Sequence, residues 1–417
     1  MKDDSKQTLT PKLRFPEFRE GPRWEGTSLG QVVDFQSGST PSKDTPAFWN
    51  GSIPWVTAKD MKQFFLDDTE DHITPAAVDD GAKQVPAGMV LMLTRGMTLH
   101  KDLPICVLRR PMSFNQDVKA LRPKGDLEGC FVPWLLLGNK ERLLRMVDVA
   151  GHGTGKLNTE ELRVFDLTLP QPAEQQKIAD CLTSLHELIA AHGRKLDALR
   201  AHKKGLMQQL FPREGESLPR LRFPEFRHAP EWKEKKGGEF FSNRTEPGEA
   251  GLPIYSVTMN DGMVKRSSLD RVVDDIADPE GNTLARKGDI AYNMMRMWQG
   301  ALGVAGEDCM VSPAYVVLSP MEGACSDFFA YLFKLPQSLH LLTSHSRGLT
   351  KDRLRLYYAD FTRVPLFVPG FAEQRKIADF LASLDALIRV QVERLVALKT
   401  HKKGLMQELF PSPERTL

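Results

Sequence analysis

The chain has 417 residues, of which 41% are hydrophobic and 26% charged, and its formal net charge is +2. At about 150 residues per domain this length predicts two or three domains, and the composition excludes a wholly disordered protein. No apolar run reaches the roughly 18 residues that a membrane-spanning helix needs, and no apolar segment at the start directs secretion. Five scattered cysteines without CxxC spacing favour neither a disulfide framework nor a zinc site, so we expect a cytoplasmic protein that does not bind membranes.

The chain repeats itself. Pro11–Arg19 returns as Pro219–Arg227, and each copy is followed by a tryptophan. Residues 173–212 recur as 372–411 with 25 of 40 positions identical. We therefore interpret the chain as a tandem duplication, in which each half has a divergent body and a closely similar tail.

The duplication sets the predicted boundaries. In chain order they are a flexible N-terminal tail at 1–10, a first body at 11–170, a first long helix at 171–212, a linker at 213–218, a second body at 219–368, a second long helix at 369–412 and a C-terminal tail at 413–417.

Both bodies have the pattern of α/β or α+β domains. Short β-branched and aromatic runs bounded by turn residues predict strands at Ile53–Thr57, Val90–Thr94, Ile105–Leu108, Leu252–Thr258, Ile290–Tyr292 and Tyr315–Leu318. A 3.6-residue period predicts helices at Cys130–Leu144 and Ser326–Thr343.

A short helix is expected after Asn158, because Asn158 and Glu161 have capping-box spacing. We align Gly155–Arg163 with Arg347–Arg355 of the second body, which places Thr350 opposite Asn158. The preceding Gly151–Lys156 resembles a phosphate-binding loop but lacks its first glycine and its final Ser or Thr, and we interpret it as a flexible loop.

Each tail contains a seam of apolar residues with alternating spacings of four and three, which predicts a coiled-coil helix bounded by prolines. The seam residues of the first tail are Ile178, Leu182, Leu185, Ile189, His192, Leu196 and Leu199, and those of the second are Ile377, Leu381, Leu384, Ile388, Gln391, Leu395 and Leu398. A pseudo-two-fold axis between the repeats would make the two helices antiparallel. The expected fold class is therefore α/β (α+β), with two similar globular domains separated by two long antiparallel coiled-coil helices.

His192 and Gln391 interrupt the two seams at their midpoints. In an antiparallel pair the midpoints face each other, so we predict that these residues meet in a polar layer that fixes the register. The alternative is that both lie at a solvent-facing defect.

The bodies carry no recognisable catalytic or metal-binding motif. The chain lacks an Asn/Asp-Pro-Pro-aromatic tetrapeptide, HExxH, GxSxG and a His-x-Glu with paired cysteines. We therefore expect no catalytic residues, no bound metal and no cofactor on this chain. The loops instead mix cations, amides and hydroxyls, which are the groups that contact phosphates and base edges. The candidate DNA-binding residues are Thr57, Lys59, Arg95, Lys101 and Lys156 in the first body and Ser256, Arg296, Gln299, Arg347 and Lys351 in the second.

With these parts, the sequence resembles the specificity subunits of type I restriction–modification systems. The resemblance covers about Pro11 to Pro411 and is carried by the segment Leu169–Ile178 at the start of the first long helix and by the two His-Lys-Lys-Gly-Leu-Met-Gln segments. Val368–Ile377 departs from the pattern because it lacks the second proline.

The resemblance implies two target-recognition domains that each read one half of a split double-stranded DNA sequence. It also implies that the long helices act as a spacer and dock two methyltransferase subunits, and that restriction and translocase subunits complete the complex. The S-adenosylmethionine, ATP and Mg²⁺ sites would then lie on those partners, and this chain would be non-catalytic. An alternative function is a protein-binding scaffold with two modules spaced by a coiled coil.

Overall fold

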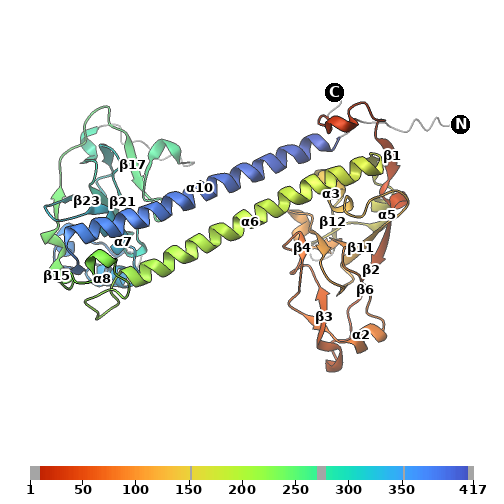
Figure 1. Ribbon diagram of the computed structural model, residues 1–417, viewed down its shortest axis with the longest axis horizontal. Coiled ribbons are helices and arrows are strands. Elements are labelled where there is room, and N and C mark those ends of the chain that lie inside the picture. The colour runs from red at the N-terminus through yellow and green to blue at the C-terminus, as the bar shows by residue number, and fades with distance from the viewer. Residues whose placement is uncertain (1–9, 151–152, 270–278, 351–352, 412–417) are drawn as a thin grey trace. The chain divides into compact units, whose positions relative to one another are not determined.

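A computed structural model describes residues 10–150, 153–269, 279–350 and 353–411. The chain forms two compact units, which we call unit 1 (residues 1–193 and 394–417) and unit 2 (residues 194–393). Two helices of 39 residues each, α6 (Pro172–Leu210) and α10 (Phe371–Leu409), contribute to both units (Figure 1). Each unit therefore contains the first part of one long helix and the last part of the other.

Unit 1 is built on two larger sheets and two small ones. The larger sheets have the strand orders β2-β11-β7-β9-β4 and β5-β3-β10-β6, and the small ones are β1-β14 and β12-β13-β8. Neighbouring strands are antiparallel except in the pairs β3–β10 and β4–β9. The strands are β1 (Glu25–Ser28), β2 (Val33–Ser37), β3 (Trp49–Val56), β4 (Phe65–Leu66), β5 (His72–Ile73), β6 (Gln84–Val85), β7 (Val90–Leu93), β8 (Arg95–Gly96), β9 (Ile105–Leu108), β10 (Met112–Phe114), β11 (Val118–Pro123), β12 (Asp148–Ala150), β13 (Thr154–Lys156) and β14 (Asp166–Leu169).

Short helices pack against these sheets, for example α1 against β2, α2 against β3 and α3 against β9. They are α1 (Leu29–Val32), α2 (Pro75–Asp79), α3 (Val132–Gly138), α4 (Lys140–Arg145) and α5 (Thr159–Arg163), with 3₁₀ helices η1 (Pro16–Phe18), η2 (Pro46–Phe48) and η3 (Met97–His100). The predicted helix over Cys130–Leu144 is thus two helices that meet at Asn139, whose side-chain amide donates to the Leu135 carbonyl oxygen. The core contains Trp24 and Trp134, and the start of α6 packs into it through Ile178 and Leu182.

Unit 2 repeats this plan. Its sheets have the strand orders β16-β23-β20-β21, β18-β17-β22-β19 and β15-β24, and β17–β22 is the parallel pair that corresponds to β3–β10. The strands are β15 (Lys233–Lys236), β16 (Phe241–Arg244), β17 (Ile254–Val257), β18 (Met263–Lys265), β19 (Thr283–Ala285), β20 (Ile290–Asn293), β21 (Leu302–Val304), β22 (Cys309–Val311), β23 (Tyr315–Pro320) and β24 (Pro365–Val368). The repeated sheets and the two long helices confirm the predicted fold class of two similar α/β domains.

The helices of unit 2 include one break that the periodicity missed. They are α7 (Ser326–Leu332), α8 (Pro336–Ser344) and α9 (Tyr358–Phe361), with 3₁₀ helices η5 (Pro224–Phe226), η6 (Gly237–Glu239), η7 (Arg266–Ser268), η8 (Pro279–Gly281) and η9 (Met297–Gln299). Pro336 starts α8 and leaves Leu335 in an extended conformation, so the predicted helix Ser326–Thr343 is divided.

The alignment of Gly155–Arg163 with Arg347–Arg355 is wrong. The Leu157 amide donates to the Thr94 carbonyl oxygen, and the corresponding bond in unit 2 runs from Leu356 to Met294. Lys156 therefore corresponds to Arg355, and α5 corresponds to α9.

One expectation for this region changes with the alignment. Thr350 does not cap the counterpart of α5, because α9 begins only at Tyr358. At the other predicted cap, Asn158 precedes α5 and its side chain accepts from the Glu160 amide. Residues 154–156, the end of the phosphate-loop look-alike, form strand β13, while 151 and 152 lie outside the described residues.

A buried ion pair explains why two of the repeated motifs occur together. The Arg14 guanidinium donates from Nε to Glu174 Oε1 at 2.8 Å and from Nη2 to Oε2 at 2.6 Å. It also donates to the carbonyl oxygens of Gly21 and Pro22. Both partners of the pair are buried, and their mutual hydrogen bonds raise the pKa of Arg14. The N-terminal motif is thereby fixed to the start of α6.

Unit 2 contains the same arrangement. Arg222 donates to both carboxylate oxygens of Glu373 at 2.7 Å, which fixes the second copy of the motif to the start of α10. In each unit the same motif also binds the end of the other long helix. The Leu13 amide donates to the Glu408 carbonyl oxygen of α10 in unit 1, and the Leu221 amide donates to the Gln209 carbonyl oxygen of α6 in unit 2.

Replacing Arg14 by Ala is expected to leave the Glu174 carboxylate buried without its cation. Breaking such a pair costs about 3–5 kcal/mol, so the free energy of unfolding measured by urea denaturation should fall by about that amount. Lys177→Ala serves as the control, because Lys177 pairs with Glu17 at the surface and its removal should change stability little. Equal losses in the two variants would contradict this assignment.

Candidate nucleic-acid interface

Exposed basic residues of unit 1 gather at the hairpin formed by β12 and β13. Arg95 on β8 and Lys156 on β13 are directly opposite each other in an antiparallel pair, and both are exposed. Side chains in this position project from the same face of the sheet, where like charges repel each other. Asp148 faces Lys156 from β12 on the other side. An anionic ligand on this face would relieve the repulsion between the two cations.

Lys101 belongs to the same region. It is exposed and follows η3, which packs against β13. The His100 ring bonds through Nε2 to the Gly153 carbonyl oxygen at 2.8 Å, which connects η3 to the hairpin. Lys156, which is far from Arg95 and Lys101 in the sequence, therefore lies in the same part of unit 1 as both of them.

Two other candidates of unit 1 are already engaged within the protein. The Thr57 hydroxyl donates to Asp60 Oδ2 at 2.8 Å. Lys59 Nζ lies 2.8 Å from Glu70 Oε2 and 2.9 Å from Asp71 Oδ2, and these contacts raise the pKa of the lysine. Lys59 is thus a weaker candidate for a DNA contact than Arg95.

In unit 2, Arg296 and Gln299 lie on a tight turn between β20 and β21. Both side chains are exposed, and η9 occupies the turn between them. Gly300 closes the turn with a φ of 81°, a left-handed conformation that favours glycine. Ser256 lies elsewhere, half-buried on β17 and paired with Val264 on β18.

Arg347 is held by a carboxylate of α9. Its guanidinium donates to Asp360 Oδ1 at 2.7 Å, which raises the pKa of the arginine, yet most of its side chain remains exposed. Arg347 also forms a β-bridge with Arg355, which is exposed as well. Lys351 lies outside the described residues.

Arg355 is the residue that the candidate set missed. It corresponds to Lys156, but the shifted alignment placed Gly348 at that position instead. The hydrogen bonds from the Leu157 amide to Thr94 and from the Leu356 amide to Met294 reveal the correspondence. Within the sequence, Leu157 and Leu356 each follow the basic residue, and this was the available signal.

Exposed apolar side chains lie next to these cations. Met97 is 63% exposed and Val149 is 70% exposed at the basic hairpin of unit 1, and Leu349 is 99% exposed between Arg347 and Arg355 of unit 2. Apolar side chains beside Arg and Lys suit a DNA groove, since they can contact thymine methyl groups while the cations contact phosphates or guanines.

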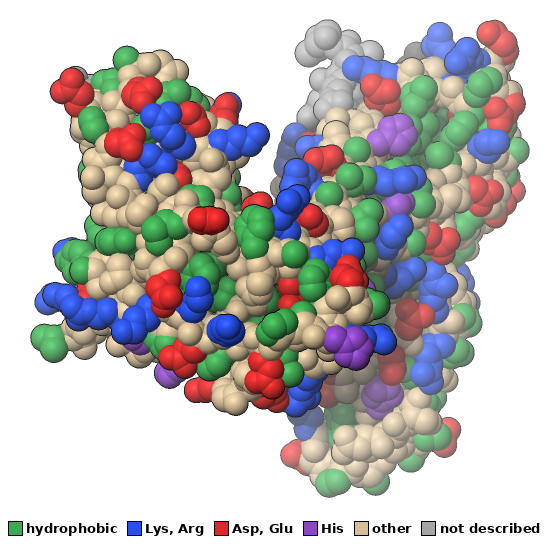
Figure 2. Space-filling view, turned by 60° about the vertical axis from the view of Figure 1, so that its left-hand side comes forward, with side chains coloured by type: hydrophobic (Ala, Val, Ile, Leu, Met, Phe, Trp, Pro, Cys, Tyr) green, Lys and Arg blue, Asp and Glu red, His purple; other side chains and the backbone are tan. Residues whose placement is uncertain are grey.

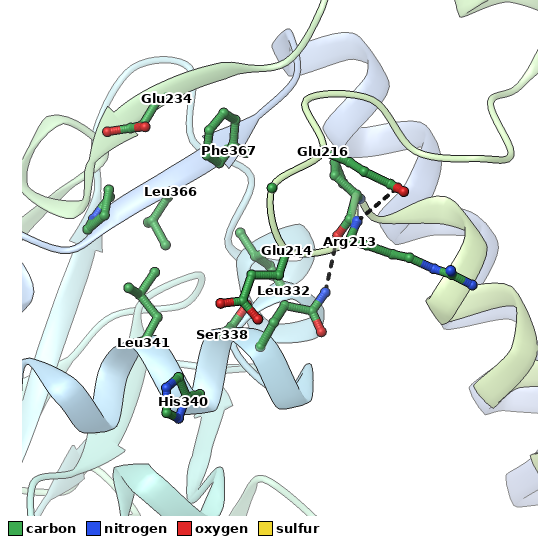
Figure 3. Close-up of a pocket in the computed structure, with 14 residues that line it drawn as sticks. Arg213, Glu214, Glu216, Glu234, Leu332, Ser338, His340, Leu341, Leu366 and Phe367 are labelled. Atoms are coloured by element: carbon green, nitrogen blue, oxygen red, sulfur yellow. Dashed lines mark hydrogen bonds between the residues drawn. The ribbon is translucent and has the colours of Figure 1, made fainter.

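Figure 2 shows basic and acidic side chains interspersed over the face that it presents. A cavity of about 240 Å³ in unit 2 is apolar with an acidic rim: Leu341, Leu366 and Phe367 line it together with Glu214 and Glu234 (Figure 3). These carboxylates disfavour a phosphate ligand in that cavity.

Neither a metal cluster nor a membrane-spanning helix is found in the part of the chain that the structure describes. There, no three His, Cys, Asp or Glu side chains gather closely enough to hold a metal ion. No described helix combines the length and the apolar character that crossing a membrane requires.

Comparison with known proteins finds one family. Residues 22–201 match the family described as type I restriction modification DNA specificity domain. The MjaVIII specificity subunit of Methanocaldococcus jannaschii is 21% identical over 420 residues, which cover 95% of this chain and 93% of that subunit. The chain is thus similar to the specificity subunits of type I restriction–modification systems.

Other specificity subunits match over shorter segments. The EcoR124I/EcoR124II specificity subunit of Escherichia coli is 32% identical over 173 residues, 41% of this chain and 43% of that subunit. The MjaIX subunit of M. jannaschii is 27% identical over 171 residues, 40% of this chain and 38% of its own length. The chain therefore spans less than half of the length of these two relatives.

Solved structures have the same fold over the full chain. The S subunit of a type I restriction–modification system from M. genitalium matches with a TM-score of 0.63 at 16% identity and covers 97% of this chain and 100% of its own. A chain from a study of complex assembly and conformational transition of the type I system matches with a TM-score of 0.51 at 19% identity, covering 94% of this chain and 98% of its own.

The two long helices bury the predicted seam residues. All fourteen seam residues are buried or half-buried, whereas Leu188, Leu387 and Val390 on other faces are exposed. Gln391 is 6% exposed and His192 is half-buried, but they belong to different units and their meeting in a polar layer stays a prediction.

A lysine lies among the apolar side chains of the helices in each unit. In unit 2, Lys203 forms an ion pair with Asp385, which also accepts a hydrogen bond from Tyr331. In unit 1, the corresponding Lys402 donates to Nδ1 of His186 at 2.9 Å and lies 4.5 Å from the centre of the Trp134 ring. Burial lowers the pKa of Lys402 to about 8, while burial and then the charge of Lys402 lower that of His186 to about 4.

The contact between Lys402 and His186 should make the free energy of unfolding more sensitive to acid than the ion pair between Lys203 and Asp385 does. Because the pKa of His186 is lowered from 6.5 to about 4, the unfolded chain binds its proton first, and stability falls as the pH drops from 6.5 towards 4. His186→Asp should give Lys402 the carboxylate that Lys203 has, which removes this loss and raises stability at pH 7 by about 1–2 kcal/mol.

Urea denaturation at pH 7.5 and pH 5.0 tests this expectation. Asp385→His is the matched variant, and it should destabilise the protein at both pH values and steepen the acid loss. The interpretation is wrong if His186→Asp is no more stable than the unchanged chain and retains its acid sensitivity.

Proposed function

We propose that this chain is the DNA-recognition component of a type I restriction–modification complex and is itself non-catalytic. It would read a bipartite double-stranded DNA target, one half with each unit, and dock two methyltransferase subunits and the restriction subunits. S-adenosylmethionine, ATP and Mg²⁺ would be bound by those partners. The similarity to type I specificity subunits and the repeated architecture support this proposal.

One observation supports the assignment of the DNA-contacting residues. Each unit presents exposed cations at the same place. They lie beside the residue that directly follows a buried strand, which is Thr94 after β7 in unit 1 and Met294 after β20 in unit 2. In unit 1 these are Arg95 and Lys156, and in unit 2 they are Arg296 and Arg355. Arginine and lysine there can contact guanine edges or phosphates, and the surrounding loop sequences differ between the units, as two different half-sites require.

Arg95→Ala and Arg296→Ala are expected to weaken binding of the assembled complex to its target by about 1–3 kcal/mol each, because each removes a cation that can contact a base or a phosphate. Lys59→Ala is the control, since Lys59 already pairs with Glu70 and Asp71 and should contribute little. Fluorescence anisotropy with labelled duplexes at two salt concentrations measures the effect. If all three variants bind like the unchanged complex, these arginines are not DNA contacts.

Exchange of the second body tests whether each unit reads one half of the DNA target. Replacing residues 219–368 by the corresponding body of another specificity subunit should change one half of the methylated sequence and leave the other intact. Sequencing that maps methylated adenines in the host genome reads out both halves. A change in both halves would refute the assignment of one half-site to each unit, and a chain that supports no adenine methylation would refute the proposed function.

A further inference from the structure

Arg347 of unit 2 is held both at its backbone and at its guanidinium. Its amide donates to the Arg355 carbonyl oxygen at 2.9 Å, and its own carbonyl oxygen accepts from the Arg355 amide at 2.8 Å. Its Nη2 donates to Asp360 Oδ1 at 2.7 Å, although 64% of the side chain is exposed. The arginine therefore faces solvent in a fixed position.

The Asp360 carboxylate in turn depends on this arginine. Asp360 is 7% exposed on α9, and in the described part of the chain its second oxygen, Oδ2, has no hydrogen-bond partner. The next residue, Phe361, is fully buried and packs against the rings of Tyr292 and Phe333, which fixes α9 in the core. Because a buried carboxylate without its cation is strongly unfavourable, Asp360 orders the guanidinium before any ligand binds.

Unit 1 has a different charge pattern at the corresponding positions. Asp148 takes the place of Arg347, since it pairs with Lys156 across the hairpin of unit 1 as Arg347 pairs across that of unit 2. The residue that corresponds to Asp360 is Glu161, which is exposed. At these positions, an arginine held by a buried carboxylate therefore occurs in unit 2 and not in unit 1.

This reversal of charge favours a base over a phosphate as the ligand of Arg347. Phosphates are alike in every DNA sequence, so a residue that only holds the backbone would serve both units equally well. An arginine in one unit and an acid in the other suit groups that differ between two half-sites, and base edges differ in this way. The neighbouring Leu349 is 99% exposed, and an apolar side chain can contact a thymine methyl group in the groove.

We propose that Arg347 reads a guanine in the half-site bound by unit 2 and that Asp360 is its positioning residue. This inference rests on the proposed function, in which each unit binds one half of the DNA target. A guanidinium offers five N–H donors in a rigid fork, and the donors that Asp360 does not use can bind O6 and N7 of guanine together. Because the side chain is already ordered, binding costs little further side-chain entropy.

Maps of methylated adenines test the proposal in hosts that carry a variant chain in place of the unchanged one. Asp360→Asn should lower the preference for one guanine over the other bases about tenfold, within the half-site that unit 2 reads. Arg347→Lys, which keeps the charge but loses the fork, should relax the same position. The exchange of residues 219–368 identifies which half-site this is.

Synthetic duplexes measure the contact directly in the assembled complex. Replacing that guanine by 7-deazaguanine removes N7, which should weaken binding by the unchanged complex about tenfold in fluorescence anisotropy. A complex with Arg347→Ala should not distinguish the two duplexes. Adding Asp360→Asn to Arg347→Ala should change the base preference no further, because a positioning residue acts only through the residue that it positions.

A second arginine–aspartate pair in unit 2 supplies the matched control. Asp289 accepts from Arg244 Nε at 2.6 Å, and both side chains are largely buried, so Arg244 is not available to a ligand. Asp289→Asn makes the same chemical change and should lower stability while it leaves the recognised sequence unchanged. Thermal melting followed by circular dichroism verifies that each variant folds.

Three outcomes would overturn the proposal. The first is a half-site of unit 2 that contains no guanine, or whose guanines all keep their full preference in the folded Asp360→Asn and Arg347→Lys variants. The second is an equal loss of affinity for all sequences in Arg347→Ala, which would make Arg347 a phosphate contact. The third is an equal relaxation in Asp289→Asn, which would reduce Asp360 to a structural role.

Failure of the proposed function would look different. An unchanged chain that supports no adenine methylation and no DNA binding in its complex would refute that function, whereas the three outcomes above leave it intact and concern Arg347 and Asp360 alone.

Discussion

Each long helix begins at a buried carboxylate that is bound by an arginine from the start of its own repeat. Because Glu174 accepts two bonds from Arg14, and Glu373 two from Arg222, the position of each helix relative to its sheets is fixed at the atomic level. The neighbouring glutamine contributes in the same way, since Gln175 accepts from the Glu128 amide. The position of the sheets relative to the long helix in each unit follows from this attachment.

Much of the fold could be predicted from the sequence because it depends on local periodicity. The duplication, the strands at Val90–Thr94 and Tyr315–Leu318, and the long helices all follow from patterns within a few dozen residues. The division of the helical stretch at Asn139 and the register of the hairpin around Arg355 did not follow. Both depend on hydrogen bonds and packing between elements, which spacing in the sequence does not encode.

The candidate site was predictable in composition but not in detail. Arg95 and Lys156 were selected separately for their chemistry, and only the pairing of β8 with β13 places them opposite each other. Lys59 had the same chemistry but is held by Glu70 and Asp71, which come from the segment between β4 and β5. Whether a cation is available to a ligand is decided by its three-dimensional neighbours.

The backbone bond between Leu13 and Glu408 joins the two ends of the described chain in the same way that Leu221 and Gln209 are joined across a short linker. In both units, therefore, the start of one repeat is bound by the end of the other repeat's long helix. Since these segments are nearly the same in both repeats, the bond does not depend on which body lies between them. A body can thus be exchanged while the attachment that completes its unit is kept.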